Sequence, residues 1–282
     1  MDIHWVDVFA TAPLSGNPLA VITAGAMPRD DAMQRLAAEL GLSETVFAVP
    51  GDPPRLRIFT PEAEIPLAGH PLVGAAWVLR RIGWVGSEAM LSTPAGDIPV
   101  QADDHGAAMT RSGPVSPGSA DAGAVAECLG GRAVGDAPIW DAGLPQVMLE
   151  VADLDGLSPD HDALRLQARD EGWAGVSAYV VRGRGNGAVE AEVRHFASPI
   201  GIPEDPVTGS AAGALGAALA AGGDGDAQGG LRLVVRQGRH LGRDGLVQVD
   251  VAGGPGGPTA VTIGGAVVPV MAGIIGEGIL PG

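Results

Sequence analysis

The sequence predicts an α+β protein of two similar domains, each with a mixed or antiparallel sheet or barrel wrapped round a central apolar helix. The chain has 282 residues, which suits two domains at roughly 150 residues each. The order of predicted elements in the first half recurs in the second. Each half also contains a charge-free run, 65–79 and 211–221, typical of a helix buried on every side.

The first half begins with alternating strands and one amphipathic helix. The helix opens at the acidic pair Asp30 and Asp31, places apolar residues at helical spacing, and stops at Gly41. Apolar alternation and turn residues predict the remaining elements in this order: strands 3–9 and 19–22, helix 30–40, strands 45–49 and 56–59, the charge-free run 65–79, and strands near 90–91 and 98–101.

The second half repeats this pattern. Helix 163–172 ends in glycine as 32–41 does, and Arg194-His-Phe matches Arg57-Ile-Phe. Gly209-Ser210 opens the second apolar helix, as Gly69-His70 opens the first. A stretch rich in Ser, Pro, Gly and Ala, 111–123, marks the boundary between domains 1–115 and 124–282. The charge-free end of the chain either completes the second domain or returns to the first.

Composition excludes several classes of function. With 33 acidic and 17 basic residues and a net charge of −16, neither nucleic acid nor an anionic membrane is an expected partner. All 17 basic residues are arginine, so no lysine exists to bind pyridoxal phosphate or to complete a P-loop. We therefore expect a small-molecule substrate.

Cysteine and histidine usage narrows the chemistry further. Cys128 is the single cysteine, so an internal disulfide and a racemase with two thiols are both impossible. The six histidines show no metal-ligand spacing, and we expect no metal. The first residues lack the pattern of a secretory signal, no segment resembles a membrane span, and we expect a cytoplasmic protein.

Glu44 is the first candidate catalytic residue. It lies between a helix stop and an apolar strand, and its counterpart in the other half is Gly175 or Val176. A carboxyl group present in one half alone indicates a role beyond the framework. The alternative is a strand glutamate in water, whereas a buried carboxyl would have a raised pKa and could transfer protons.

The starts of the two apolar helices form the next candidates. His70 follows Gly69, and Ser210 follows Gly209, where free N–H groups and the helix dipole attract an anion. Two such starts facing one cleft, where the domains meet, would hold a small carboxylate. A histidine that merely caps its helix is the alternative.

Two further polar residues lie near the second helix start. Asp205 stands between prolines, four residues before Gly209, and could contact a histidine or a substrate amine. Ordinary turn chemistry would also explain an Asp-Pro pair. Gln237, before a glycine, offers a weaker polar contact.

The chain resembles the PhzF family, phenazine-biosynthesis-type isomerases that share the diaminopimelate epimerase fold. The resemblance spans nearly the whole chain. It rests on these ordered motifs: Val6-Asp-Val-Phe with Gly16-Asn-Pro-Leu-Ala-Val, Leu42-Ser-Glu-Thr-Val-Phe, Arg57-Ile-Phe-Thr-Pro with Glu64-Ile-Pro-Leu-Ala-Gly-His-Pro, and Glu204-Asp-Pro-Val-Thr-Gly-Ser-Ala.

The resemblance implies two pseudo-symmetric domains, no cofactor and frequent homodimers. It also implies that Glu44 is the acid and base that moves a proton between substrate carbons, and that His70, Asp205 and Ser210 line the site. The related epimerases have cysteines near the two helix starts, and this chain does not. That difference favours a proton shift by one carboxyl group.

We therefore predict a cofactor-independent isomerase acting on a small carboxylate, the phenazine precursor 2,3-dihydro-3-hydroxyanthranilate being the substrate that the family name suggests. Two alternatives stay open, because fold alone does not fix substrate. One is an amino-acid epimerase or dehydratase of the same fold. The other is a protein that binds small carboxylates without turnover.

Overall fold

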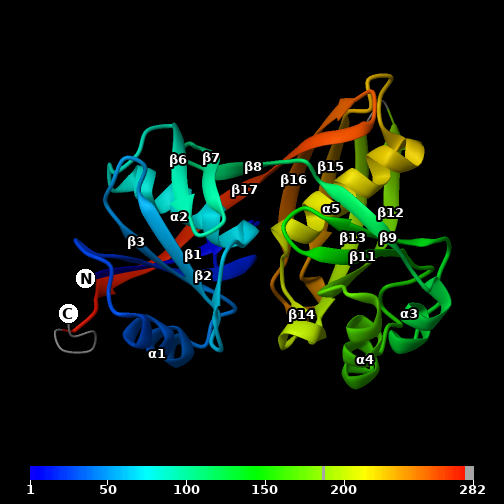
Figure 1. The fold of residues 1–282 in the computed structure, drawn as a ribbon, viewed down its shortest axis with the longest axis horizontal. Coiled ribbons are helices and arrows are strands. Elements are labelled where there is room, and N and C mark those ends of the chain that lie inside the picture. The colour runs from blue at the N-terminus through cyan, green and yellow to red at the C-terminus, as the bar shows by residue number, and fades with distance from the viewer. Residues whose placement is uncertain (186–187, 277–282) are drawn as a thin grey trace. The chain divides into compact units, whose positions relative to one another are not determined.

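The structure is a computed structural model that describes residues 1–185 and 188–276. Two compact units make up this part of the chain: unit 1 comprises Met1–Thr110 and the chain from Gly264 onward, and unit 2 comprises Arg111–Ile263. Each unit contains a central helix packed among its strands, α2 in unit 1 and α5 in unit 2 (Figure 1). The predicted α+β class is confirmed.

The elements of unit 1 follow the predicted order closely. The helix predicted over 30–40 and the strand predicted over 45–49 have those bounds in the structure. The elements are β1 (Asp2–Val8), β2 (Asn17–Thr23), α1 (Asp30–Leu40), β3 (Thr45–Val49), β4 (Arg55–Phe59), β5 (Glu64–Ile65), α2 (Gly69–Arg81), β6 (Glu88–Thr93), β7 (Gly96–Ala102) and β8 (Gly106–Ser112), whose end lies in unit 2.

Unit 2 contains more strands and several short helical turns. Its elements are β9 (Val115–Ala120), α3 (Ala122–Cys128), β10 (Ala137–Asp141), β11 (Pro145–Glu150), α4 (His161–Glu171), β12 (Gly175–Gly185), β13 (Ala188–Ala197), η1 (Ser198–Ile200), β14 (Ile202–Asp205), α5 (Gly209–Leu219), η2 (Ala220–Asp224), β15 (Leu231–Gln237), η3 (Arg239–Leu241) and β16 (Gly245–Gly254). The last strand, β17 (Gly257–Ile274), begins in unit 2 and ends in unit 1, where it pairs antiparallel with β1.

The two units share one pairing pattern. In unit 1, β1–β2 is antiparallel, β2–β3 parallel, β3–β4 and β4–β5 antiparallel, and β4–β6 parallel. In unit 2, β10–β11, β11–β12, β12–β13, β13–β14 and β13–β15 follow the same sequence of directions. The predicted internal repeat is therefore a repeat of topology.

The strand register decides which residues of the two halves correspond. Thr45 and Val176 are equivalent, because each pairs with the phenylalanine of an Arg-x-Phe motif in the next strand. The residue before each is Glu44 in unit 1 and Gly175 in unit 2. Of the two counterparts that the sequence allowed for Glu44, the structure selects Gly175.

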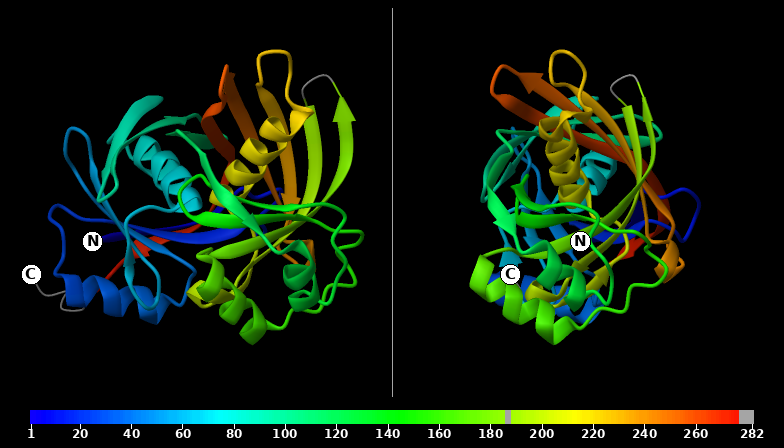
Figure 2. Two further views of the ribbon diagram at one scale, coloured as in Figure 1. Left: turned by 45° about the vertical axis from the view of Figure 1, so that its right-hand side comes forward. Right: turned by 90° about the vertical axis from the view of Figure 1, so that its right-hand side faces the viewer.

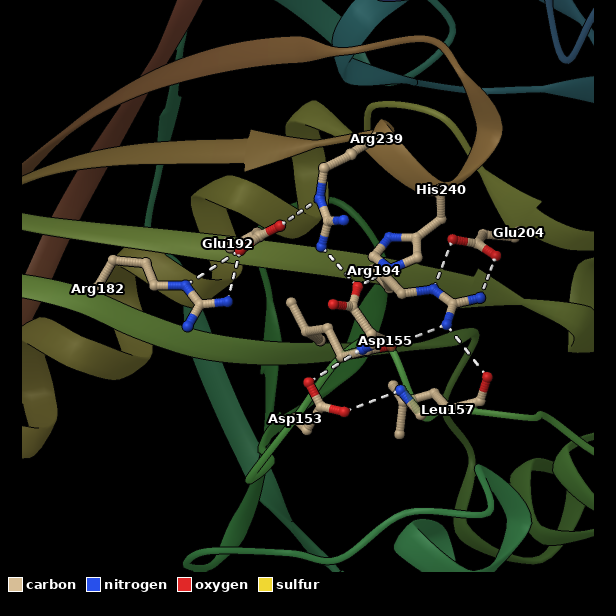
Figure 3. A network of polar contacts seen from close by, with 11 residues as sticks. Asp153, Asp155, Leu157, Arg182, Glu192, Arg194, Glu204, Arg239 and His240 are labelled. Atoms are coloured by element: carbon tan, nitrogen blue, oxygen red, sulfur yellow. Dashed lines mark hydrogen bonds and ion pairs between the residues drawn. The ribbon is translucent and has the colours of Figure 1, made fainter.

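Two equivalent ion pairs, one in each unit, link the strands that precede the central helix. Arg57 donates from Nε to Glu64 at 2.7 Å, and Arg194 donates from Nε to Glu204 at 2.9 Å. Each guanidinium also lies over the phenylalanine of its own motif, at 5.2 and 5.0 Å from the ring centre. Arg194 additionally donates to the carbonyl oxygen of Leu157 (Figure 3). These contacts fix the strand that leads into α2 or α5.

Each central helix packs tightly because small residues face the strands. A Cβ atom at Gly74 of α2 would lie 2.4 Å from Leu19 of β2, and one at Gly213 of α5 would lie 2.7 Å from Ile263. These glycines let the strands approach the helix closely. In Figure 2, α5 (yellow) lies along neighbouring strands of unit 2, in agreement with its packing on β15 and β16.

Outer helices cover a second apolar layer in each unit. Met33 and Ala37 of α1 pack against Phe47 and Phe59, whose rings meet edge to face at 5.5 Å. α4 packs with α3 over strands of unit 2. Both α1 and α4 end at a glycine in the left-handed conformation, as the sequence predicts.

The stretch 111–123 is more ordered than its composition indicates. It contains β9, which pairs antiparallel with β10, and the start of α3. The residues of β9 are mostly exposed, which explains why it lacks an apolar signal. No helix in the described part of the chain is long and apolar enough to cross a bilayer.

Candidate functional site

Glu44 is a largely buried carboxyl group in the residue just before β3. It lies three residues after Gly41, which ends α1, and its side chain is only 12% exposed. Burial raises the pKa of Glu44 from 4.5 to about 7, and the neighbouring Ser43 side chain offsets part of this rise. The group is therefore close to half ionised at neutral pH, which suits both the loss and the gain of a proton.

His70, the second residue of α2, faces this carboxyl group. Its ring is 5% exposed, and Nε2 lies 3.4 Å from Glu44 Oε2. On the other side of the ring, Nδ1 lies 3.4 Å from Asn17 Nδ2. Because that amide nitrogen donates, Nδ1 accepts, and the ring proton is on Nε2, the nitrogen nearest to Glu44.

Asn17 is held in the orientation that this arrangement requires. The Ser43 hydroxyl donates to Asn17 Oδ1 at 3.4 Å, which leaves the amide nitrogen on the side of His70. The residue before it, Gly16, has φ +68°, and a Cβ atom there would lie 2.4 Å from the carbonyl oxygen of Val8. Only glycine fits this turn.

One oxygen of the carboxyl group has no hydrogen-bond donor among the described residues. Across the described chain, Glu44 Oε2 is buried and forms no hydrogen bond, since its contact with the imidazole lacks hydrogen-bond geometry. A buried acceptor without a donor is destabilising in the framework of a protein. Such an oxygen is available to a proton, which is the property expected of an acid and base.

Asp205 lies at the end of β14, just before α5, and is buried. Its carboxylate accepts a hydrogen bond from the Thr208 hydroxyl. Gln237 Nε2 donates to the carbonyl oxygen of Asp205 at 2.8 Å, and Gln237 Oε1 accepts from Thr208 N at 3.2 Å. Both ends of the Gln237 amide thus hold the turn into α5.

Ser210 is the second residue of α5, the position that His70 has in α2. Gly209, which starts the helix, is buried. Gln146 Nε2 donates to Ser210 Oγ at 3.3 Å. Gln146 was not among the predicted site residues, and its one sequence signal is that it interrupts the otherwise apolar strand Pro-Gln-Val-Met-Leu.

His195 is a second polar residue that sequence reasoning missed. It is fully buried in β13, pairs in register with Asp205, and has Nδ1 3.0 Å from Ser177 Oγ. Burial lowers the pKa of His195 to about 4, so the ring is neutral at neutral pH. A Cβ atom at Gly175 would lie 2.8 Å from this ring, so the imidazole covers the glycine that corresponds to Glu44.

The predicted site residues thus form two sets, one in each unit. In unit 1 the structure brings together Glu44, His70 and Gly69, and in unit 2 it brings together Asp205, Gly209, Ser210 and Gln237. That both sets serve one site where the domains meet stays a prediction. Among the described residues, no cluster of three metal-binding side chains occurs.

The profile of the PhzC-PhzF family of phenazine biosynthesis-like proteins matches residues 6–273. The chain belongs to this family. A crystal structure of a PhzF-family phenazine biosynthesis protein from Bacillus anthracis covers 98% of both chains with a TM-score of 0.84 at 26% identity. The predicted family is therefore confirmed, and the PhzF fold extends over the chain.

Curated relatives of this PhzF-family protein are isomerases. A protein named uncharacterized isomerase YddE, from Escherichia coli strain K12, is 32% identical, over 94% of this chain and 95% of its own. A trans-2,3-dihydro-3-hydroxyanthranilate isomerase from Pseudomonas chlororaphis is 31% identical, over 92% of this chain and 94% of its own. The protein is an isomerase of the PhzF family, as the sequence predicts.

Proposed function

We propose that this isomerase moves a proton between two carbon atoms of a small carboxylate, without a cofactor, and that Glu44 carries the proton. The observation that supports this most directly is the state of the Glu44 carboxyl group. It is buried, its pKa is about 7, and Oε2 forms no hydrogen bond within the described chain.

The chemistry balances without an oxidant or a second reactant. The Glu44 carboxylate removes a proton from one carbon, and the electron pair of the C–H bond is delocalised into the substrate as an enol- or enamine-like intermediate. The protonated carboxyl group then returns the proton to another carbon. A pKa near neutrality serves both steps, since the same group must act as base and then as acid.

His70 is proposed to orient the substrate and to steady the carboxylate form of Glu44. Its Nε2–H lies on the side of Glu44, at 3.4 Å, and Asn17 fixes this tautomer. This contact lacks hydrogen-bond geometry in the structure, and we propose that the Nε2–H turns to donate to the carboxylate when Glu44 ionises, which would stabilise the charge without consuming it. Asp205 is proposed to orient the substrate or to carry a second proton.

The substrate carboxylate is proposed to bind at helix starts. Gly69 begins α2 and Gly209 begins α5; neither helix has an acidic residue in its first turn or a side chain that caps it. The first N–H groups of a helix have no partners inside the helix, and the helix dipole favours an anion there. Both helix starts therefore suit a carboxylate.

The compound named for the Pseudomonas chlororaphis relative is the first substrate to try. Trans-2,3-dihydro-3-hydroxyanthranilate is a small ring carboxylate, the class that we propose here. Its conversion would be followed by NMR, alongside a panel of other small cyclic and amino carboxylates. The comparison uses wild-type protein, Glu44→Gln and Glu39→Gln, a control that removes an exposed glutamate of α1.

The expected result is turnover by wild type and Glu39→Gln and none by a folded Glu44→Gln variant. Inversion at one carbon without migration of a double bond would favour an epimerase, and loss of water would favour a dehydratase. Binding of panel members without chemical change would favour a carboxylate-binding protein. Full activity in Glu44→Gln would refute the role of that residue.

A further inference from the structure

Gln146 has an environment that the proton transfer proposed above does not explain. It is the second residue of β11 and is only 2% exposed. Its amide nitrogen donates to Ser210 Oγ, in the first turn of α5, at 3.3 Å. The side chain therefore reaches the start of the central helix of unit 2.

The other end of this amide lacks a partner. Within residues 1–185 and 188–276, Gln146 Oε1 is buried and accepts no hydrogen bond. Most buried polar groups in proteins are hydrogen-bonded, and a buried carbonyl oxygen without a donor costs free energy. An amide that is half satisfied at a helix start indicates that a donor arrives from elsewhere.

The internal repeat shows that the fold does not need an amide at this position. Leu19 precedes the residue that pairs with Thr45, and Gln146 precedes the residue that pairs with Val176, so Leu19 and Gln146 correspond. Leu19 is fully buried and packs against Gly74 of the central helix. In unit 1 this position is therefore served by an apolar side chain that makes no hydrogen bond.

The start of α5 complements this acceptor with a site for an anion. The helix runs over 11 residues, has no acidic residue in its first turn, and receives no side-chain cap from Thr208. Its first N–H groups and its dipole favour a carboxylate. A single ligand can bind to the helix start and also donate to Gln146 Oε1 if it carries a hydrogen-bond donor beside its carboxylate.

We infer that Gln146 is a specificity-determining residue, whose Oε1 accepts a hydrogen bond from an amino or hydroxyl group next to the substrate carboxylate. The inference rests on the proposed function in one respect, namely that the substrate is a small carboxylate. A substrate without the donor would leave the buried oxygen unsatisfied, which is a strong basis for discrimination.

The test compares two ring carboxylates that differ by a single amino group, 2-aminobenzoate and benzoate. Their affinities for the wild-type protein, Gln146→Leu and Glu44→Gln would be measured by calorimetry. Leucine is the residue that the repeat places at the matching position. Gln146→Met, which keeps the length of the side chain, replaces Gln146→Leu if that variant does not fold. The side-chain NH2 signals of Gln146 in NMR spectra show whether binding occurs at this residue.

We expect wild type to bind 2-aminobenzoate about tenfold more tightly than benzoate, the value of one hydrogen bond to a buried acceptor. In Gln146→Leu the two affinities become equal, through weaker binding of 2-aminobenzoate and unchanged binding of benzoate. In wild type, 2-aminobenzoate shifts the Gln146 NH2 signals.

Three results would overturn the inference: no preference in wild type, an unchanged preference in the Gln146 variant, or no binding of 2-aminobenzoate at millimolar concentration. The Glu44→Gln variant distinguishes a failure of this inference from a failure of the proposed function. It should keep the tenfold preference, because binding needs no proton transfer. If Glu44→Gln proved fully active, the role of Glu44 would fail while the preference set by Gln146 would still be measured.

Discussion

Replacing Glu44 by glutamine should stabilise the protein, and the gain should grow with pH. The pKa of Glu44 rises from 4.5 to about 7 on folding because the carboxyl group is buried. Between pH 4.5 and pH 7 the folded state holds a proton that the unfolded state has lost. The free energy of unfolding is therefore not reduced by this group below pH 4.5, and it falls as the pH rises toward 7. The rise corresponds to about 3 kcal/mol of lost stability above pH 7.

Glutamine at position 44 avoids this loss of stability and should not disturb the packing. It has nearly the shape of glutamate, and Glu44 Oε2 makes no hydrogen bond, in the described part of the chain, that an amide would break. Urea unfolding of wild type and Glu44→Gln would be measured at pH 5 and pH 8. We expect the stability advantage of Glu44→Gln to be larger at pH 8 by about 2 kcal/mol.

The control is Glu39→Gln, which removes an exposed carboxylate from α1 and should follow wild type at both pH values. An advantage of Glu44→Gln that stays constant or shrinks between pH 5 and pH 8 would refute the reasoning, because the carboxyl group would then not be held protonated by burial. Stability gained together with activity lost is the pattern expected of a functional group in a strained environment.

Three further predictions concern the framework of the site. Glu204→Gln should lower the free energy of unfolding by about 3 kcal/mol, because it leaves Arg194 charged and largely buried. Glu64→Gln, in the more exposed matching pair with Arg57, should lower it by about 1 kcal/mol. Equal losses for the two variants in urea unfolding would contradict this. Gly74→Ala should cost about 1–3 kcal/mol, because its Cβ atom would lie 2.4 Å from a leucine side chain; an unchanged melting temperature would show that the core adapts. His195→Asn should flatten the fall in stability between pH 6.5 and 4, since the pKa of about 4 means that the unfolded state takes up a proton first; an equally steep fall in the variant would show that this ring is not the cause.

Elements with a local signal were predictable from the sequence. Helix α1 was predicted with its observed bounds because the spacing of Met33 and Ala37, the acidic first turn and the glycine stop agree. Glu44 stood out because one half of the repeat has a carboxyl group where the other half has none. Its burial, which gives it a pKa near 7, depends on packing and became visible only in the structure.

Residues whose role depends on distant partners left a much weaker signal in the sequence. Asn17 and Gln146 lie near the starts of largely apolar strands, and His195 lies in a strand with other charged residues, so periodicity does not distinguish the three from solvent-facing positions. Their partners lie 53, 64 and 18 residues away. The long strand β17 is rich in glycine, and its pairing with β1 joins the two ends of the chain, which local patterns do not encode.

The central claim is that the Glu44 carboxyl group carries a proton between carbon atoms. Its most direct test is incubation with trans-2,3-dihydro-3-hydroxyanthranilate and related carboxylates in D2O, with carbon-bound deuterium read by mass spectrometry. Wild type and Glu39→Gln are expected to place deuterium on carbon, and folded Glu44→Gln to place none. Incorporation by Glu44→Gln at the wild-type rate would contradict the claim.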